Sequence, residues 1–475
     1  MGRFALAPGK ESSVTLSAMA VSPSRRIAFD ILRVVEAKGA HAGDLLHERL
    51  DARVKPQDAA LATELTLGVL RWQGLLDFLV ERQTKKTVAA MDAEVRIALR
   101  IGLYQLRYLN RVPARSAVNE SVELVKRARK ASAAGLVNAV LRRLADSATE
   151  PVETQLPAGL PRAERLAIIH SHPAWLVERW LKRFGEEQTV ALLESNNRAP
   201  RTTLAVHDAA GAAQARAALE AAGMQIAAGR WLKSTLVIES GAAGPALTQS
   251  AAYRGGKISI QDEASQMIPL LLDVQPGQRV LDLCAAPGGK TMTLAFAAGP
   301  SGSVVAADLH AHRLRGSVEQ LRRTGAPNTC AVALDATKPL PFSGEFDRIL
   351  VDAPCSGTGT LGRNPEIRWR LRPEDLADLH RRQAELLERT LEVLAPGGVL
   401  VYATCSLEPE ENEEVVGEIV AAHSEMQRVV PNESLRSDLL DSGSDRNFVD
   451  AHGWFRTFPP AHHTDGFFAA ILRHE

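Results

Sequence analysis

Apolar residues in the N-terminal third of the chain recur with the period of an α-helix. Val95, Leu99, Leu103 and Leu106 fall on one helical face. A second stripe of the same kind consists of Leu136, Val137, Val140, Leu141 and Leu144. Alternation of β-branched residues is scarce in this part of the sequence. The pattern therefore predicts an all-α bundle over residues 22–150.

The middle of the chain predicts a smaller, mixed region. The Pro-bearing stretch "DSATEPVETQLPAGLPRAE" is typical of a linker. Residues 163–198 have a helical pattern. The short β-like runs "RTTLAVH", "WLKSTLVIES" and "GKISIQD" then surround an Ala-rich helical segment at 210–222. We expect a connecting helical and α+β region over residues 160–260.

From about residue 275 the pattern changes to an alternation of strands and helices. Five apolar runs are separated by helical segments: "RVLDLC", "GSVVAAD", "TCAVALD", "FDRILVDAP" and "GGVLVYATC". Strands spaced in this way form βαβ units, and their sheet is parallel with helices on both faces. Residues 261–475 are therefore predicted to form an α/β, Rossmann-like domain, which makes the 475-residue chain a multidomain protein.

The net charge of zero conceals an uneven distribution. Residues 22–145 hold 22 Lys and Arg against 13 Asp and Glu, a charge of +9, so the rest of the chain carries −9. A basic domain on a neutral protein favours a polyanionic partner such as nucleic acid. A solvated, Arg-rich helical surface would give the same count.

Cysteine usage and hydropathy narrow the cellular setting. Four cysteines without a C-x-x-C pair argue against a disulfide framework and a structural zinc site, so we expect no metal and a reducing cytoplasm. No apolar run reaches the roughly 18 residues of a membrane span. Residues 1–20 lack the apolar core of a signal peptide and are expected to be a disordered extension, with Met19 as an alternative start.

Acids and thiols gather where the predicted parallel strands end. Ligands of open parallel sheets bind at this edge. The acids are Asp282, Asp308, Asp335 and Asp352, and the thiols are Cys355 and Cys405. A single such acid could equally be a helix N-cap. Four in register favour a nucleoside cofactor, and so many carboxylates suit a cation such as S-adenosylmethionine better than a triphosphate.

A turn of small residues follows the first of these strands. It consists of Cys284, Ala285, Ala286, Pro287, Gly288, Gly289 and Lys290. A P-loop would need Gly at position 284, so this motif is excluded. Small residues still let the backbone approach a ligand, with helix N-terminal amides exposed to it.

Three motifs resemble those of the RNA cytosine-C5 methyltransferases: "DLCAAPGGKT", "VDAPCSGTGT" and "YATCSLEPEENE". The basic helical N-terminus is similar to the NusB-like RNA-binding domain of the bacterial 16S rRNA enzymes in that family. The resemblance runs from residue 22 to "TDGFFAAILR", whereas residues 1–20 and 430–452 carry no family signal. It implies transfer of a methyl group from S-adenosylmethionine to carbon 5 of a cytosine in 16S rRNA, naked or in a small-subunit precursor, by a cytoplasmic monomer.

The resemblance also implies roles for individual residues. Cys405 would attack carbon 6 of the cytosine, Cys355 would serve product release, and Asp352 would bind the N3/N4 edge of the base. DNA cytosine-C5 enzymes attack from a Pro-Cys motif instead, so these two thiol roles depend on the resemblance alone. The cofactor would be bound by the 284–290 turn together with Asp308, Asp335 and Asp352. A single Cys is more often a small buried hydrophobic residue, and we expect this of the thiols of Cys284 and Cys330.

Some alternatives remain open at this stage. Asn364, Arg368 and Trp369 combine charge with an aromatic ring and are candidates for RNA contact, although a surface helix could look the same. A tRNA cytosine-C5 methyltransferase would share the three motifs. A non-catalytic NusB-like RNA-binding factor would share the basic helical domain.

Overall fold

A computed structural model describes residues 21–51, 53–147, 150–207, 211–240, 244–326, 328–430 and 448–475. The predicted extension at 1–20, with Met19, lies outside these residues, as does most of 430–452. The chain divides into two compact units. The first comprises residues up to Ala40, Gln57–Val69 and Leu75–Gln155, and the second comprises His41–Pro56, Leu70–Gly74 and Leu156–Glu475.

The first unit is helical, as the 3.6-residue periodicity predicts. Its helices are α1 (Pro23–Lys38), most of α3 (Pro56–Thr84), α4 (Ala93–Tyr108), α5 (Ala114–Arg127) and α6 (Ala134–Asp146), with short 3-10 turns at Val88–Ala90, Ala131–Ala133 and Val152–Gln155. On α4, Val95, Leu99 and Leu103 are buried. On α6 most of the predicted stripe is buried, but Leu136 is 45% exposed, contrary to the prediction. Helices α4 and α6 pack closely at Gly102, where a Cβ would lie 2.4 Å from Leu141.

Some arginines of this basic unit are buried in its interior, where they pair with acidic or polar side chains. Arg100 is buried and forms a two-bond pair with Asp77, at 2.7 and 2.8 Å. Arg25 is buried between Glu120, at 2.9 Å, and the side-chain oxygen of Gln105, at 2.7 Å. The buried arginines therefore do not contribute to a basic surface, and any such surface is formed by the exposed basic residues.

The second unit begins with helices and a small antiparallel sheet. It contains α2 (Ala42–Arg49), α7 (Arg162–His170), α8 (Ala174–Asn196), β1 (Thr202–Val206), α9 (Ala212–Ala221), β2 (Gln225–Ala228), β3 (Thr235–Ser240), α10 (Pro245–Gln249), α11 (Ala251–Arg254) and β4 (Ile258–Ile260). The strand order is β2-β3-β1-β4. Strand β2 is an addition to the prediction, because a four-residue strand that begins with Gln gives no clear alternation.

The larger sheet has the predicted parallel strands at its centre. Its elements are α12 (Glu263–Leu270), β5 (Arg279–Leu283), α13 (Gly289–Ala298), β6 (Ser303–Asp308), α14 (Ala311–Thr324), β7 (Thr329–Ala333), β8 (Phe346–Asp352), α15 (Ile367–Arg370), α16 (Asp375–Leu391), β9 (Leu394–Thr404), α17 (Glu413–Ala422), β10 (Met426–Val429), β11 (Phe455–Thr457), α19 (Pro459–His462) and β12 (Phe467–His474), with 3-10 turns at Thr358–Thr360 and Pro409–Glu411. The order is β7-β6-β5-β8-β9-β12-β10. Strands β5 to β9 are parallel, and β12 is antiparallel to both of its neighbours.

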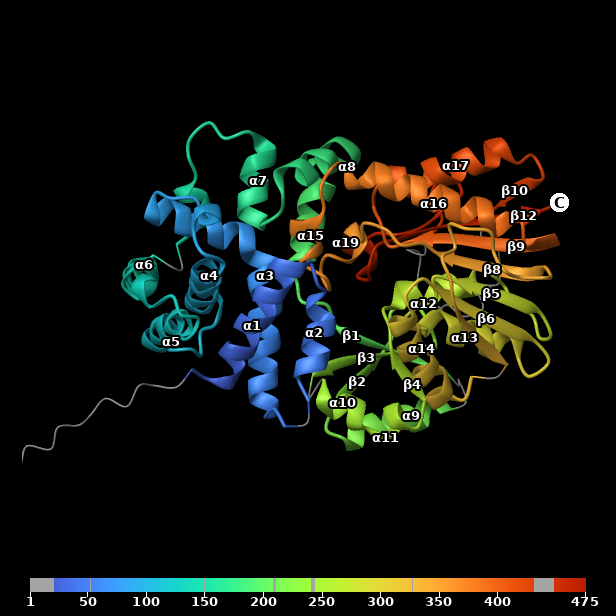
Figure 1. The fold of residues 1–475 in the computed structure, drawn as a ribbon, viewed down its shortest axis with the longest axis horizontal. Helices are drawn as coiled ribbons and strands as arrows, with labels where there is room; N and C mark the ends of the chain where they lie inside the picture. The colour runs from blue at the N-terminus through green and yellow to red at the C-terminus, as the bar shows by residue number, and fades with distance from the viewer. Residues whose placement is uncertain are drawn as a thin grey trace, which may run out of the picture. The chain divides into compact units, whose positions relative to one another are not determined.

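Helices cover both faces of this sheet (Figure 1). One core joins α12 and α13 to residues such as Val280, Leu350 and Val401. The other joins α16 and α17 to Leu281, Ile349 and other residues that alternate with the first set along the strands. Burial on both faces explains why these strands read as continuous apolar runs.

One expectation about burial was wrong. Cys330 was expected to be buried, but it is exposed because β7 is the edge strand and has no fully buried residue. In the described part of the chain, no helix combines the length and the apolar character needed to cross a membrane.

Candidate active site

The Gly-rich turn is fastened to the end of the neighbouring strand. The amides of Cys284 and Ala285 both donate to the carbonyl of Ala307 on β6, at 2.9 and 2.8 Å. Gly288 precedes α13 with a φ of 96°, in the left-handed region that favours glycine, and a Cβ there would lie 3.0 Å from Ser317. The turn thus presents backbone and a helix N-terminus to the sheet edge, as the sequence predicts.

Asp308 connects this turn to the end of β6. One carboxylate oxygen accepts a hydrogen bond from the Ala286 amide at 3.1 Å, and the other accepts from the His310 amide at 2.9 Å. Each oxygen keeps a further lone pair, so the two together can accept from the vicinal hydroxyls of a ribose. Asp335 lies two residues beyond β7 and is exposed, and its carboxylate accepts from the hydroxyl of Thr337 at 2.7 Å.

Among the described residues, neither Asp282, which is fully buried near the end of β5, nor Cys284, which is partly buried in the turn, has an ion-pair partner. Burial raises the pKa of Asp282 to about 7, and only one of its oxygens is bonded, by the hydroxyl of Thr291 at 2.6 Å. Burial, reinforced by nearby carboxylates, also raises the pKa of the Cys284 thiol. The raised pKa favours the neutral thiol form of Cys284.

Lys290 and Asp352 form an ion pair beside the turn. The Lys290 ammonium lies 2.7 Å from a carboxylate oxygen of Asp352, and it also lies 5.3 Å from the centre of the Phe467 ring. Burial lowers the pKa of Lys290, but the Asp352 charge outweighs this effect and raises it overall. The lysine is therefore a fixed positive charge where the glycine-rich turn meets the end of β8.

The structure brings the two predicted thiols together. Cys355 follows β8 and Cys405 follows β9, which are adjacent parallel strands, and the two sulfur atoms are 3.3 Å apart. The hydrogen bond with Cys405, followed by burial, raises the pKa of the Cys355 thiol. The Cys405 turn is held by the Gly359 amide, which donates to the Cys405 carbonyl at 2.9 Å.

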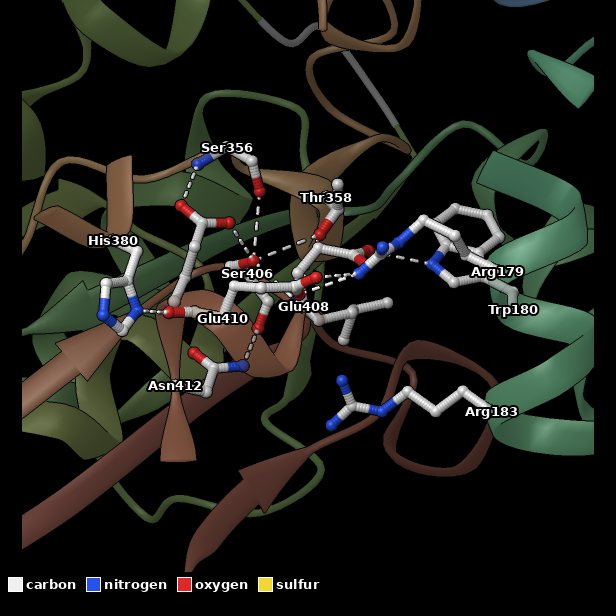
Figure 2. Close-up of polar contacts among 12 residues, drawn as sticks. Arg179, Trp180, Arg183, Ser356, Thr358, His380, Ser406, Glu408, Glu410 and Asn412 are labelled. Atoms are coloured by element: carbon white, nitrogen blue, oxygen red, sulfur yellow. Dashed lines mark hydrogen bonds and ion pairs between the residues drawn. The ribbon is translucent and has the colours of Figure 1, made fainter. Parts of the chain in front are cut away.

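Glu411, in the acidic stretch after Cys405, fastens both thiol turns from behind. Its carboxylate is fully buried and accepts from the Ser356 amide at 2.8 Å, the Ser406 hydroxyl at 2.5 Å and the Gln383 amide at 3.1 Å. Ser406 lies 3.0 Å from the Ser356 hydroxyl, as Figure 2 shows. Each Ser directly follows one of the two thiols, so Glu411 fixes the spacing between them.

The neighbouring acids attach this stretch to α8 (Figure 2). Glu408 is buried and accepts from the Trp180 indole at 3.0 Å and from Arg179 at 2.9 Å. Arg179 also bonds Glu410, at 2.7 Å. These partners are more than 220 residues apart in the sequence, so local sequence patterns give no signal for them.

The candidate RNA-contacting residues after the Pro-Cys turn lie differently from the prediction. Arg368 is fully buried, and its guanidinium donates to backbone carbonyls, among them that of Ser171 at 3.0 Å. The hypothesis that Arg368 binds RNA is therefore wrong, because its charge is needed to satisfy those carbonyls. The Trp369 indole donates to the Leu70 carbonyl at 2.6 Å, and Asn364 donates to the Thr360 hydroxyl at 3.1 Å.

Comparisons with known proteins agree with this arrangement. Family sequence models match residues 22–146 (NusB family), 172–243 (Methyltr_RsmF/B-like, ferredoxin-like domain) and 269–473 (16S rRNA methyltransferase RsmB/F). The ribosomal RNA small subunit methyltransferase B of Pseudomonas putida is 37% identical, with 84% of this chain and 88% of the relative covered. The probable ribosomal RNA small subunit methyltransferase B of Bacillus subtilis is 32% identical, with 94% and 98% covered. The chain belongs to the ribosomal RNA small subunit methyltransferase B family.

Solved structures support the same fold. The structure of PH0851 has a TM-score of 0.78 at 27% identity and covers 95% of this chain and 99% of its own. A methyltransferase homolog protein from Pyrococcus horikoshii has a TM-score of 0.55 at 29% identity, and covers 66% of this chain and all of its own. The methyltransferase B chain thus consists of a NusB-like helical region, a ferredoxin-like domain and a C-terminal methyltransferase domain that depends on S-adenosylmethionine.

The described residues fit this cofactor. Asp308 offers two oxygens to ribose hydroxyls, Gly288 and Gly289 leave the backbone accessible, and the Asp352 carboxylate at the end of β8 would attract a sulfonium. Among the described residues no cluster of side chains suits a metal ion.

Proposed function

We propose that this methyltransferase B transfers a methyl group to carbon 5 of a specific cytosine in 16S rRNA through a covalent adduct of Cys405 at carbon 6. The single observation that carries the proposal is the pair of thiols 3.3 Å apart, at the ends of adjacent strands and next to the Lys290–Asp352 pair. The names of the methyltransferase B relatives support rRNA as the substrate.

Carbon 5 of cytosine is a weak nucleophile, and covalent catalysis overcomes this weakness. The Cys405 thiolate adds to carbon 6 and breaks the 5,6 double bond, so the electron pair becomes available at carbon 5. S-adenosylmethionine supplies the electrophilic methyl group that carbon 5 takes. A base then removes the carbon-5 proton, the double bond forms again, and Cys405 leaves as a thiolate.

Cys355 is assigned to the release step. Its sulfur lies 3.3 Å from the sulfur of Cys405, and the raised pKa of Cys355 favours its thiol form. A hydrogen bond from this thiol stabilises the leaving thiolate. Lys290 adds a positive charge that favours thiolate formation, and Asp352 accepts from the N3/N4 edge of the base as positive charge develops on it.

The two thiols can be separated by their adducts. Cys405→Ala should form no covalent protein–RNA complex and lose essentially all turnover. Cys355→Ala should still attack and methylate once, and should then accumulate a complex with RNA that survives denaturing electrophoresis. The reverse pattern would exchange the two roles. Full activity without an adduct in both variants would remove both cysteines from the chemistry.

Bisulfite sequencing of total RNA from a deletion strain tests the substrate. We expect one cytosine of 16S rRNA to lose its methyl group, and complementation with Cys405→Ala to leave it unmethylated. Loss of a tRNA methyl group instead would favour the tRNA enzyme. No change in any RNA, with an intact fold, would favour the non-catalytic NusB-like factor. The predicted cytoplasmic monomer and the domain boundaries at 22–150, 160–260 and 261–475 belong to this proposal.

The NusB-like region is proposed to bind RNA electrostatically. Arg127 and Arg129 are exposed, whereas Lys126 pairs with Glu123 at 2.7 Å and Lys130 pairs with Asp92 at 3.0 Å. Replacement of all four cations by Gln should weaken RNA binding and flatten its dependence on salt, with cofactor binding unchanged. If the variant shows the same salt dependence as the wild type, these four residues form a solvated surface and do not bind RNA.

A further inference from the structure

A pocket of about 520 Å³ lies within the second unit, apart from every residue assigned to the cofactor. It is lined by the loop from α8 to β1, by the turn after β2, and by the loop between α19 and β12. Its volume is in the range of pockets that hold a small ligand or a nucleotide. The proposed function leaves this pocket unexplained.

Three arginines surround this pocket and converge on one histidine. Arg198 and Arg201 are more than 70% exposed, and Arg230 is exposed with its guanidinium 5.3 Å from the Trp231 ring. Burial lowers the pKa of His463, and the charges of Arg230, Arg198 and Arg201 lower it further. All four residues line the pocket, so the three positive charges border a common space.

The acids that line the pocket are already engaged. Asp262 and Asp465 both bind Arg363, at 2.5 and 2.9 Å. Glu263 accepts from three successive backbone amides, those of Arg230, Trp231 and Leu232. These carboxylates therefore have little capacity left to neutralise the arginines.

The pairs of the arginines themselves are weak. Arg198 lies 3.5 Å from Glu194, Arg201 lies 3.8 Å from Glu239, and both pairs are at exposed positions. Ion pairs of this kind contribute little and exchange readily. Among the described residues, no ion pair is recorded for Arg230. All three guanidinium groups can therefore turn to an anionic ligand.

The pocket adjoins the turn that carries the proposed nucleophile. Gly359 lines it, and the Gly359 amide is the group that donates to the Cys405 carbonyl. The Gly359 carbonyl accepts from Gly466 at 2.8 Å, immediately before β12. The pocket and the Cys405 turn thus share Gly359, so an RNA strand whose cytosine reaches Cys405 passes near the pocket.

We propose that the pocket binds the phosphodiester backbone next to the target cytosine, with Arg198, Arg201 and Arg230 as the phosphate ligands. Guanidinium groups match phosphate oxygens in two-bond geometry. Such contacts would hold the RNA strand in place while the base leaves its stack. The inference depends on the proposed function for its substrate, and it identifies residues that the sequence motifs do not contain.

The test is the salt dependence of RNA binding by the full-length Arg198→Gln/Arg201→Gln/Arg230→Gln variant, with an RNA fragment that the wild type methylates. Loss of three phosphate contacts to a single strand should reduce the slope of log K against log salt by roughly two. We expect at least a roughly tenfold loss of affinity at low salt. The KM for RNA should rise while the rate at saturating RNA, the affinity for S-adenosylmethionine and the melting temperature stay as in the wild type.

Arg322→Gln is the matched control. Arg322 is 79% exposed on α14 and pairs with a helical glutamate at 3.5 Å, as Arg198 does, but it does not line the pocket. The control removes one charge and the triple variant removes three, so a control that loses a third of the slope lost by the triple variant would overturn the proposal, because the effect would then be one of general charge.

Neutral methylphosphonate linkages, placed one at a time around the mapped cytosine, locate the contacts. The wild type should lose affinity at one or more adjacent linkages, and the triple variant should be insensitive at the same linkages. Equal sensitivity of both proteins at every linkage would overturn the proposal while methylation stands. A wild type that binds the RNA but methylates no cytosine would overturn the proposed function, and the slopes would still decide whether the pocket binds phosphate.

Discussion

Glu411 offers the sharpest test of how the two thiols are held. Its buried carboxylate accepts from the Ser356 amide, the Ser406 hydroxyl and the Gln383 amide. Glu411→Ala removes the acceptor of all three donors at once. Ser406 can turn towards the hydroxyls of Ser356 or Thr358, at 3.0 and 3.4 Å, and Gln383 keeps its bond to the Pro354 carbonyl. The Ser356 amide is the group left without a partner.

The magnitude follows from this count. A buried donor without a partner costs about 1–3 kcal/mol, and the cavity left by the truncated side chain adds a further cost. Burial of the Glu411 carboxylate is itself unfavourable and raises the pKa of this group. Removal of the carboxylate relieves this cost, which offsets part of the lost stability. We expect Glu411→Ala to lower the free energy of unfolding by roughly 2–4 kcal/mol. Glu411→Gln retains an acceptor for Ser356 and should cost about 1 kcal/mol.

Denaturant unfolding, followed together with the yield of covalent RNA adduct, measures both consequences. The adduct yield at saturating RNA and cofactor should fall in Glu411→Ala, because the spacing of the thiols is no longer fixed. Glu410→Ala is the matched control, since the adjacent Glu410 is half-buried and pairs with Arg179. Its loss should cost under about 1 kcal/mol and leave the adduct intact. Equal effects of the two alanine variants would refute the reasoning.

Three further predictions concern the same domain. Burial raises the pKa of Asp282 from 3.8 to about 7, so its contribution to stability is present in acid and is lost as pH rises from about 4 through 7. Asp282→Asn should remove this decline in stability, which amounts to up to roughly 4 kcal/mol. Hydrogen exchange in β5 at several pH values measures the decline, and an equal decline in the wild type and the variant would contradict the prediction. Asp308→Ala should weaken S-adenosylmethionine binding by roughly 1.5–3 kcal/mol, and unchanged affinity by calorimetry would remove Asp308 from the site. In Gly359→Ala the new Cβ would lie 2.1 Å from the Gly466 carbonyl oxygen, so this variant should destabilise the Cys405 turn. The control is Gly417→Ala, whose Cβ would have nothing within 4 Å and which should keep the adduct yield. A wild-type melting temperature for Gly359→Ala would argue against the clash.

The sequence predicted the fold where the periodicity was strong. The apolar runs of β5, β6, β8 and β9 contribute buried residues to the cores on the two faces, and β8 and β9 end at Asp352 and Thr404, as predicted. Strand β2 escaped notice because it is short. The antiparallel strands β10 and β12 were not predicted, because the alternating β/α pattern describes only parallel strands. Pairing at the far edge of a sheet also leaves no local signal in the sequence.

The candidate site was predictable where strand ends place residues at one edge. This reasoning brought Cys355 and Cys405 together before any contact was known. It could not show that the acidic residues after Cys405 act as buried acceptors, because their partners lie on α8 and α16. The prediction that Arg368 contacts RNA was wrong because charge composition does not report burial. A fully buried guanidinium that donates to backbone carbonyls cannot be distinguished in the sequence from an exposed one.

The position of β12 has a consequence for the order in which the domain can form. This strand lies between β9 and β10, and Phe468 pairs with Thr404, next to Cys405. Until residues 467–474 have been synthesised, β9 is an open edge strand with unpaired backbone groups, which is a hazard for aggregation. A nascent chain that has completed both thiol motifs therefore still lacks the sheet that supports them. β12 ends at His474, 69 residues beyond Cys405 (474 − 405), so the sheet that supports both thiol turns is complete only after this stretch has been added.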